Sequence, residues 1–217
     1  MKTHGTYIPA LRFPFLTRFF DPIVRVLLKD EKFRRRLIAE ADIQHGQSVL
    51  DIGCGTGTLA LLIKQAVPSA KIAGIDADPS ILSLARDKAV RAGADILFIE
   101  GFADAVPLPS ESYDRVVSSL AFHHMSTDSK RGTLAEVFRL LRSGGTFHIA
   151  DWGEAQNLLM RAAFLGVQLL DGFETTADSV AGRLISLLCE AGFANVQETH
   201  HEMTLLGTLS LYRATRM

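Results

Sequence analysis

From Ser48 onward the sequence alternates short apolar segments with longer segments of helical periodicity. The apolar segments, which predict strands, are 48–52, 71–75, 95–99, 113–119 and 145–150, and the helical segments are about 57–66, 79–92 and 128–142. Strands that alternate with helices of about 10–15 residues are typical of βαβ units and a parallel sheet. The segments VLDI, IAGI and ILFI are apolar throughout, as expected for strands covered by helices on both faces. The sequence therefore predicts a doubly wound α/β fold.

The C-terminal part departs from this alternation. Residues 154–171 and 177–191 predict two helices, and residues 194–203 and 204–214 predict two strands with no helix between them. Two strands joined directly must form an antiparallel hairpin. We therefore expect a seven-stranded, mostly parallel sheet that ends in an antiparallel hairpin.

Residues 1–47 predict a helical N-terminal extension or lid in front of the core, 48–217. Residues 1–36 carry nine basic and three acidic groups, although the whole chain has a net charge of −1. Within 22–40 the apolar residues share one helix face and the basic residues occupy the other. Such a segment is compatible with a solvated helix, a lid over a substrate site, or a contact of residues 12–36 with an anionic membrane surface. With 217 residues and no linker or repeat, the chain is expected to be one domain.

Composition and charge exclude several classes of protein. The near-neutral net charge argues against a nucleic-acid partner held mainly by charge. The two cysteines, Cys54 and Cys189, form no CxxC pair, which excludes a disulfide framework or a zinc ribbon and favours a reducing, cytoplasmic location. No signal peptide is expected, and no apolar stretch is long enough for a transmembrane helix.

A glycine-rich turn, VLDIGCGTG at 49–57, links the first predicted strand to the first helix. Backbone N–H groups at such a helix start can bind a ligand, and glycine permits both the sharp turn and a close approach. Asp51 stands two residues before Gly53, where its carboxylate would repel a pyrophosphate but attract a cationic ligand. Asp76 ends the second strand, where a carboxylate can accept hydrogen bonds from both ribose hydroxyls. The pattern indicates a nucleoside that carries a positive charge.

The turn resembles motif I of class I S-adenosylmethionine-dependent methyltransferases, and 74–80 resembles the segment that follows it. Residues 113–124 (YDRVVSSLAFHH) and 140–151 (LLRSGGTFHIAD) are similar to the fourth- and fifth-strand motifs of the small-molecule subgroup that includes the ubiquinone/menaquinone methyltransferases. The tail, 188–215, resembles that subgroup's closing helix and hairpin. The resemblance covers about 40–214. It implies a Rossmann-like fold, S-adenosylmethionine as cofactor, and in-line methyl transfer to a small, for example quinone- or lipid-like, acceptor.

The resemblance also implies roles for individual residues in cofactor binding. Gly53, Gly55 and Gly57 would lie against the methionine and ribose parts of the cofactor. Asp51 would orient the methionine end, partly through water, and Asp76 would hold the ribose hydroxyls.

The remaining expected cofactor contacts come from loops after three further strands. Ala77 would pack on the adenine, and Ser119 would line the sulfonium through its backbone. Where the family often shows Gly-Asp-Ala, this chain reads GFAD at 101–104. Either Phe102 stacks on the adenine, with Ala103 beside it in the site, or Asp104 takes the polar role.

His123 is the candidate catalytic residue, because one of the pair His123-His124 would face the acceptor as a base or hydrogen-bond donor. Adjacent histidines on a helix point about 100° apart, so we expect no metal site at this pair. Cys54 has no base positioned for it in the sequence and is expected to be a small buried filler.

Two other functions compete with methyl transfer. A nicotinamide-dependent oxidoreductase is disfavoured because Thr58 stands where a dinucleotide fingerprint has its third glycine, and no Tyr-x-x-x-Lys pair exists. A non-catalytic protein that binds S-adenosylmethionine would share the same motifs. Turnover of an acceptor distinguishes it from an enzyme.

Overall fold

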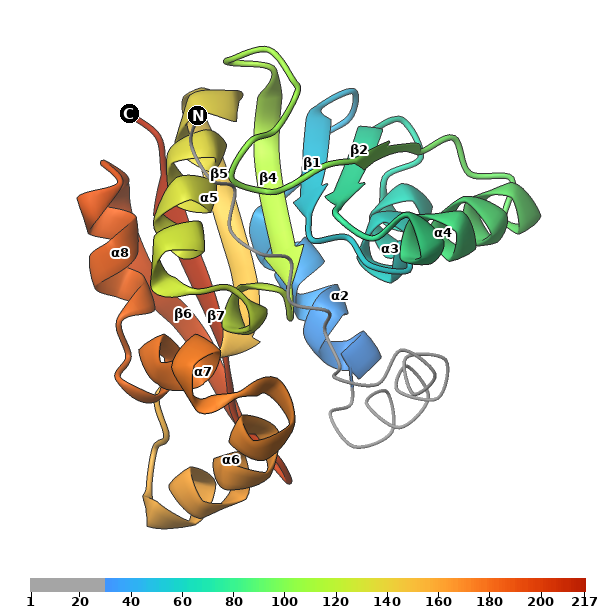
Figure 1. The fold of residues 1–217 in the computed structure, drawn as a ribbon. Helices are drawn as coiled ribbons and strands as arrows, with labels where there is room; N and C mark the ends of the chain where they lie inside the picture. The colour runs from blue at the N-terminus through green and yellow to red at the C-terminus, as the bar shows by residue number, and fades with distance from the viewer. Residues whose placement is uncertain (1–29) are drawn as a thin grey trace, which may run out of the picture.

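The computed structural model describes residues 30–217 (Figure 1). Residues 1–29 lie outside the described part of the chain. The predicted helix face over 22–29, and most of the basic segment 12–36, therefore stay predictions.

One seven-stranded sheet forms the centre of the protein, with the strand order β3-β2-β1-β4-β5-β7-β6. The strands are β1 (Ser48–Ile52), β2 (Lys71–Asp76), β3 (Leu97–Glu100), β4 (Tyr113–Ser119), β5 (Leu141–Trp152), β6 (Ala194–Thr204) and β7 (Gly207–Thr215). The first five are parallel, and β7 pairs antiparallel with both β5 and β6. This confirms the predicted doubly wound sheet with an antiparallel C-terminal hairpin. The strand order reverses between β1 and β4, the position where open α/β sheets bind ligands.

Helices cover both faces of the sheet (Figure 1). They are α2 (Asp30–Ala41), α3 (Thr58–Ala66), α4 (Pro79–Arg91), α5 (Thr127–Leu140), α6 (Leu158–Asp171), α7 (Phe173–Val180) and α8 (Leu184–Glu190), with a 3₁₀ turn, η2 (Phe122–His124). One buried cluster joins α2, α3 and α4 to one face, and a second joins α5 and α8 to the other. These helices account for the apolar composition of the parallel strands.

Two predicted boundaries were wrong, each for a local reason. The segment expected as one helix, 177–191, belongs to α7 and α8, which are separated at Gly182, whose φ of 62° no helix interior accommodates. The cap of α5 is Ser126, whose side chain accepts a hydrogen bond from the backbone N–H of Ser129.

Strand β5 also begins earlier than predicted. Gly144 and Gly145 lie inside β5, which begins at Leu141 and not at Gly145. The register with β4 shifts here, since Tyr113 pairs with Leu141 but Arg115 pairs with Thr146. The glycines therefore form a bulge, where the positive φ of Gly144 (77°) is tolerated.

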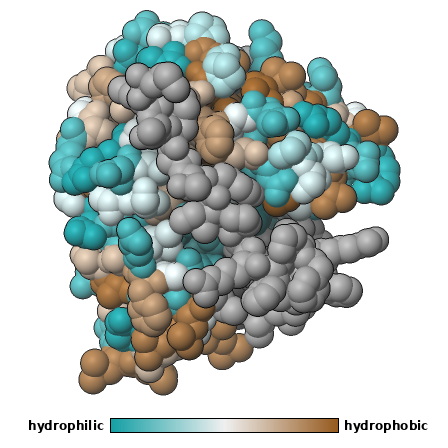
Figure 2. Space-filling model, in the orientation of Figure 1, coloured by the Kyte–Doolittle hydropathy of each residue, from teal (hydrophilic) through white to brown (hydrophobic). Residues whose placement is uncertain are grey.

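The outer surface of α6 is apolar. Figure 2 shows hydrophobic side chains gathered at the lower end of the molecule, the end where α6 lies. The exposed large side chains there include Leu158, Leu159, Leu165 and Leu169. Among the described residues, no helix has both the length and the apolar character that crossing a membrane requires.

The described end of the N-terminal extension is part of the core. In α2, Phe33 is 4 % exposed, and it packs in the same cluster as Leu37, Ala41 and the buried residues of α3. The helix predicted as a lid is therefore, from Asp30 onward, a structural element of the domain.

We expect Phe33→Ala to lower the free energy of unfolding by about 3–5 kcal/mol, because it removes a buried aromatic ring and leaves a cavity. Denaturant titration followed by circular dichroism measures this change. The matched control is Val90→Ala, at an exposed position of α4, which should change stability by no more than about 0.5 kcal/mol. Equal effects of the two substitutions would show that α2 does not stabilise the core.

Candidate active site

The predicted site residues come together at the carboxyl ends of the parallel strands. Asp51 lies in β1, Asp76 is the last residue of β2, and Ser119 is the last residue of β4. Because β1 pairs with both β2 and β4, the three ends are adjacent. The candidate site thus lies at the reversal of strand order.

The three glycines of the turn all have positive φ angles, of 65° at Gly53, 52° at Gly55 and 71° at Gly57. A Cβ at Gly53 would lie 2.5 Å from the Cβ of Ala121, and one at Gly57 would lie 2.8 Å from the ring of Phe98. A Cβ at Gly55 would meet no atom within 4 Å. Packing therefore requires glycine at Gly53 and Gly57, whereas Gly55 leaves open space in which a ligand fits.

Asp76 ties the end of β2 to this turn. Its Oδ2 accepts a hydrogen bond from the backbone N–H of Gly55 (2.9 Å), and its Oδ1 accepts one from the N–H of Asp78 (3.0 Å). Burial raises the pKa of Asp76 in spite of these bonds. The cap of α4 is Asp78, which accepts from the N–H of Ser80 (2.8 Å). Asp76 is therefore not the helix cap and remains part of the candidate site.

Asp51 is a buried carboxylate with an unsatisfied oxygen. Asp51 is 1 % exposed, and its Oδ2 has no hydrogen-bond partner among the described residues. Burial raises the pKa of Asp51 to about 7, against the opposing charge of Arg34 and with a smaller contribution from the charge of Asp76. A buried carboxylate of this kind is costly unless a cation or a donor reaches it. The site thus fits a ligand with a positively charged group, such as the ammonium of S-adenosylmethionine.

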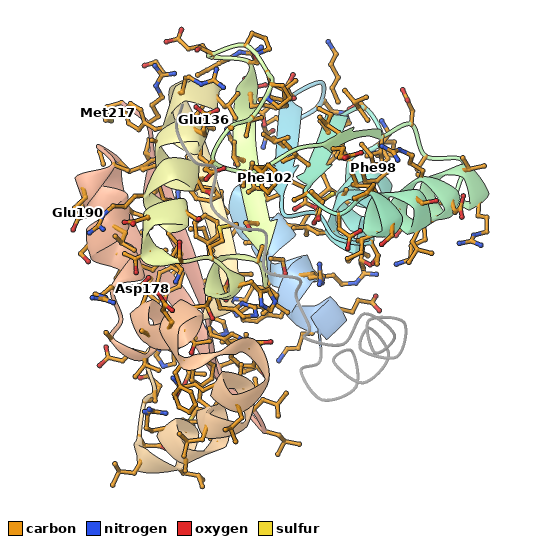
Figure 3. All side chains as sticks on the ribbon, viewed as in Figure 1. Phe98, Phe102, Glu136, Asp178, Glu190 and Met217 are labelled. Atoms are coloured by element: carbon orange, nitrogen blue, oxygen red, sulfur yellow. The ribbon has the colours of Figure 1, made fainter. Side chains whose placement is uncertain are left out.

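The segment after β3 reaches the same region. The backbone N–H of Gly101 donates to the carbonyl of Asp76 (3.0 Å), which sets this segment beside the end of β2. Phe102 is 39 % exposed on the segment that follows β3 (Figure 3), and Ala103 packs against the core. Asp104 lies close to Gly132 of α5, where an added Cβ would come within 2.8 Å of the Asp104 Cβ. Phe102 is thus the more accessible of the two candidates for contact with adenine.

His123 is the middle residue of η2, which follows β4, and it is buried, with 4 % of its surface exposed. Its Nδ1 lies 2.7 Å from Oδ1 of Asp151, a residue of the neighbouring strand β5. Burial lowers the pKa of His123, but the charge of Asp151 and this hydrogen bond outweigh burial and leave the pKa above its ordinary value. Burial also opposes ionisation of Asp151, yet His123 holds the pKa of that carboxyl below its usual range. Asp151 therefore orients the ring through Nδ1 and directs Nε2 away from β5.

The predicted divergence of the two histidines was wrong. The ring centroids of His123 and His124 lie 3.9 Å apart, within the 3₁₀ turn η2. Asp171, the last residue of α6, brings a carboxylate to both rings, with its Oδ2 3.6 Å from Nε2 of His123. The sequence analysis did not identify Asp171 as a site residue. The signal for it in the sequence is that it is the one acidic residue of an apolar helix and stands at its end.

Cys54 is buried inside the turn, and burial raises the pKa of its thiol far above the ordinary value. The thiol therefore stays protonated, which confirms its interpretation as a small filler and excludes it as a nucleophile.

Comparisons with known proteins define the class of this fold and site. A family model described as "Methyltransferase domain" matches residues 49–145. An uncharacterized methyltransferase of Synechocystis sp. is 30 % identical over 172 residues, which cover 78 % of this chain and 77 % of that protein. The chain belongs to the class I S-adenosylmethionine-dependent methyltransferases, with S-adenosylmethionine as cofactor. The oxidoreductase alternative is thereby excluded.

Within that class, the chain is similar to enzymes of quinone methylation. A demethylmenaquinone methyltransferase of Thermus thermophilus is 33 % identical over 123 residues, which cover 57 % of this chain and 55 % of that protein. Another, from Symbiobacterium thermophilum, is 27 % identical over 212 residues, or 82 % of its length. Among solved structures, the methyltransferase SibL matches with a TM-score of 0.72 at 20 % identity, covering 94 % of this chain and 60 % of that one. At this identity, the likeness shows only that the two proteins share a fold.

We expect Asp51→Asn to flatten the pH dependence of stability. Burial raises the pKa of Asp51 to about 7 in the folded protein, whereas in the unfolded chain the carboxyl has its ordinary pKa of 3.8. The folded state therefore binds more protons between these values, so the wild type loses stability as the pH rises through this window. Denaturant titrations at pH 4.5 and 8 should show a smaller difference for Asp51→Asn than for the wild type.

The matched control for this measurement is Asp128→Asn, at an exposed position of α5. The free energy of unfolding of this variant should differ between pH 4.5 and pH 8 by as much as that of the wild type. If the unfolding free energies of Asp51→Asn and the wild type change equally between the two pH values, Asp51 is ionised throughout this range.

Proposed function

We propose that this enzyme methylates a small, quinone-like acceptor, and that His123 takes the proton that such an acceptor must lose. The observation that carries the proposal is the buried pair of His123 and Asp151 at the carboxyl edge of the sheet, with Nδ1 and Oδ1 2.7 Å apart. Methylation of an activated ring carbon or a phenol requires a proton acceptor, and an oriented imidazole suits that task. The relatives named as demethylmenaquinone methyltransferases support an acceptor of this class.

The cofactor would be held by the residues that close the carboxyl edge. The unsatisfied Oδ2 of Asp51 and the open space at Gly55 would receive its charged amino-acid part. Asp76 would accept hydrogen bonds from the ribose hydroxyls, while Ala77 and the exposed ring of Phe102 would contact the adenine.

Two further contacts belong to this proposal. Ala103 adjoins Phe102 at the adenine end. Ser119 ends β4 beside β1, where its backbone would line the methyl-bearing sulfur. When bound, S-adenosylmethionine supplies an electrophilic methyl group on a sulfonium.

The contribution of the chain is chiefly positional. Holding two reacting groups in line can supply about 7–11 kcal/mol of the barrier. Asp151 fixes the His123 ring by accepting at Oδ1, and its Oδ2 accepts from the backbone N–H of Phe122 (2.8 Å), so the carboxylate is itself held in place. A proton moved to Nε2 of His123 is stabilised by Asp151, because the pair then becomes an ion pair in a buried site.

We also propose a cytoplasmic enzyme without a nucleic-acid partner. The contact of residues 12–36 with a membrane surface stays a proposal. In its described part, Arg35 pairs with Glu31 and Arg36 with Glu40. The apolar outer surface of α6 is a second surface that would suit lipid.

We expect Asp76→Ala to abolish measurable binding of S-adenosylmethionine, because it removes both the ribose acceptor and the hydrogen bond that shapes the turn at Gly55. Isothermal titration calorimetry measures the affinity. Asp78→Ala, the control two residues away, should cost about 0.5–2 kcal/mol of stability through loss of the α4 cap but retain binding. Undiminished affinity in Asp76→Ala would refute the placement of the ribose.

We expect the wild type to methylate demethylmenaquinone presented in detergent micelles, with formation of S-adenosylhomocysteine measured by mass spectrometry. His123→Gln should lower kcat by about 10²–10⁴-fold, the usual contribution of a general base, and should leave the affinity for S-adenosylmethionine unchanged. A rate in His123→Gln equal to that of the wild type would contradict the proton-acceptor role. An absence of product from demethylmenaquinone, and from hydroxylated aromatic compounds in general, would favour the non-catalytic alternative.

A further inference from the structure

Three potential metal ligands meet beside the proposed acceptor site. His123 and His124 come from η2, and Asp171 comes from the far end of α6. Each offers one ligand atom, and these atoms all lie within 4.8 Å of one another. Two imidazoles and one carboxylate form the ligand set of many sites for zinc and other divalent transition metals.

The distances within this cluster suit metal ligands better than hydrogen-bond partners. Nε2 of His123 lies 3.6 Å from Oδ2 of Asp171, and Nδ1 of His124 lies 3.9 Å from Oδ1 of Asp171. Both distances exceed those of hydrogen bonds. Two ligands bonded to one tetrahedral zinc ion at about 2.0–2.1 Å are separated by about 3.3 Å, so small side-chain adjustments would bring these atoms to that spacing.

Asp171 carries an unsatisfied atom into the cluster. Its side chain is 6 % exposed, and its Oδ1 has no hydrogen-bond partner among residues 30–217. Within residues 30–217, Asp171 forms ion pairs with His123 and His124. A buried carboxylate in this position is stabilised by a cation.

The surroundings orient the ligands as in known metal sites. Asp151 accepts from Nδ1 of His123 (2.7 Å), and a carboxylate on the second nitrogen is the usual partner of a metal-bound histidine. The buried Lys130 of α5 donates to Oδ2 of Asp178 in α7 (2.8 Å), which ties the helix that follows Asp171 to the core. Figure 3 shows Asp178 where α7 meets α5. The three ligand atoms thus come from elements held in fixed positions.

We propose that His123, His124 and Asp171 bind one divalent transition-metal ion, with Zn²⁺ as the best fit. The ligands are Nε2 of His123, Nδ1 of His124 and a carboxylate oxygen of Asp171, and a further position stays open for water or an acceptor oxygen. The inference goes beyond the proposed function. A bound ion would occupy Nε2 of His123, the atom to which the proposed function assigns the proton, so the ion-bound and base-active states exclude each other.

The test is a titration of the full chain with Zn²⁺, without cofactor or acceptor, after removal of metals with a chelator. Isothermal titration calorimetry and competition with a chromogenic chelator should show one equivalent of Zn²⁺ per chain. Asp171→Asn keeps the shape of the side chain but removes its charge. Loss of a group that only hydrogen-bonds a metal ligand typically lowers metal affinity by about 10–100-fold. Asp171→Asn should lower the affinity for Zn²⁺ by more than that, because Asp171 is itself a ligand. His201→Gln, at an exposed histidine far from η2 in the sequence, should bind as the wild type does.

Cobalt provides a second measurement in case Asp171→Asn alters the fold. Co²⁺ added to the wild type should give visible absorption bands of a nitrogen- and oxygen-ligated ion, and these bands should be lost in His124→Gln. Circular dichroism checks that each variant is folded. Substoichiometric binding by the wild type, or equal affinities for Asp171→Asn and His201→Gln, would overturn the proposal. Because neither cofactor nor acceptor is present, that outcome would leave the proposed methyl transfer intact.

Discussion

The parallel pairing of β1 with β2 on one side and β4 on the other is the constraint on which the site depends. The chain leaves β1 and β2 into helices on one face, and it returns to the opposite side of β1 with β4. The loops after β1 and β4 therefore lie side by side at the carboxyl edge, where an added Cβ at Gly53 would meet Ala121. Such a reversal of strand order is the position where open α/β sheets bind ligands. The glycine turn, Asp51, Asp76 and Ser119 all meet at this place because their strands are hydrogen-bonded neighbours.

The carboxyl edge of the sheet has two regions that differ in how their buried carboxylates are paired. At the β1–β2 side, Asp51 keeps an unsatisfied oxygen, and burial raises its pKa to about 7. At the β4–β5 side, the charge of Asp151 is matched by His123. In the first region an oxygen of Asp51 is left for a donor or cation that a ligand can provide, and the second region contains a group that can hold a proton. A reaction between a cationic methyl donor and an acceptor that loses a proton uses both.

Several features were predictable because they depend on local chemistry. Periodicity identified the parallel strands and the hairpin, and the helix predicted from residue 79 begins at Pro79, with Asp78 as its cap. The errors occur where tertiary packing overrides local preference. The strand predicted from Gly145 begins at Leu141, because pairing with β4 continues on both sides of the bulge at Gly144 and Gly145. His123 and His124 were expected to diverge, but in η2, which packs against α7 and β5, their ring centroids lie 3.9 Å apart.

The sequence by itself determined the class of fold, the glycine turn, the two acidic strand ends and the family, because each is encoded in residues that are close along the chain. The tertiary structure alone decided which glycine leaves room for a ligand, which oxygen of Asp51 is unsatisfied, and that Asp171 approaches the histidines. Asp171 lies 47 positions after His124 in the sequence, and nothing in the apolar sequence of α6 indicates which way its last residue faces. That contact depends on how α6 packs against the sheet, which only the folded chain specifies.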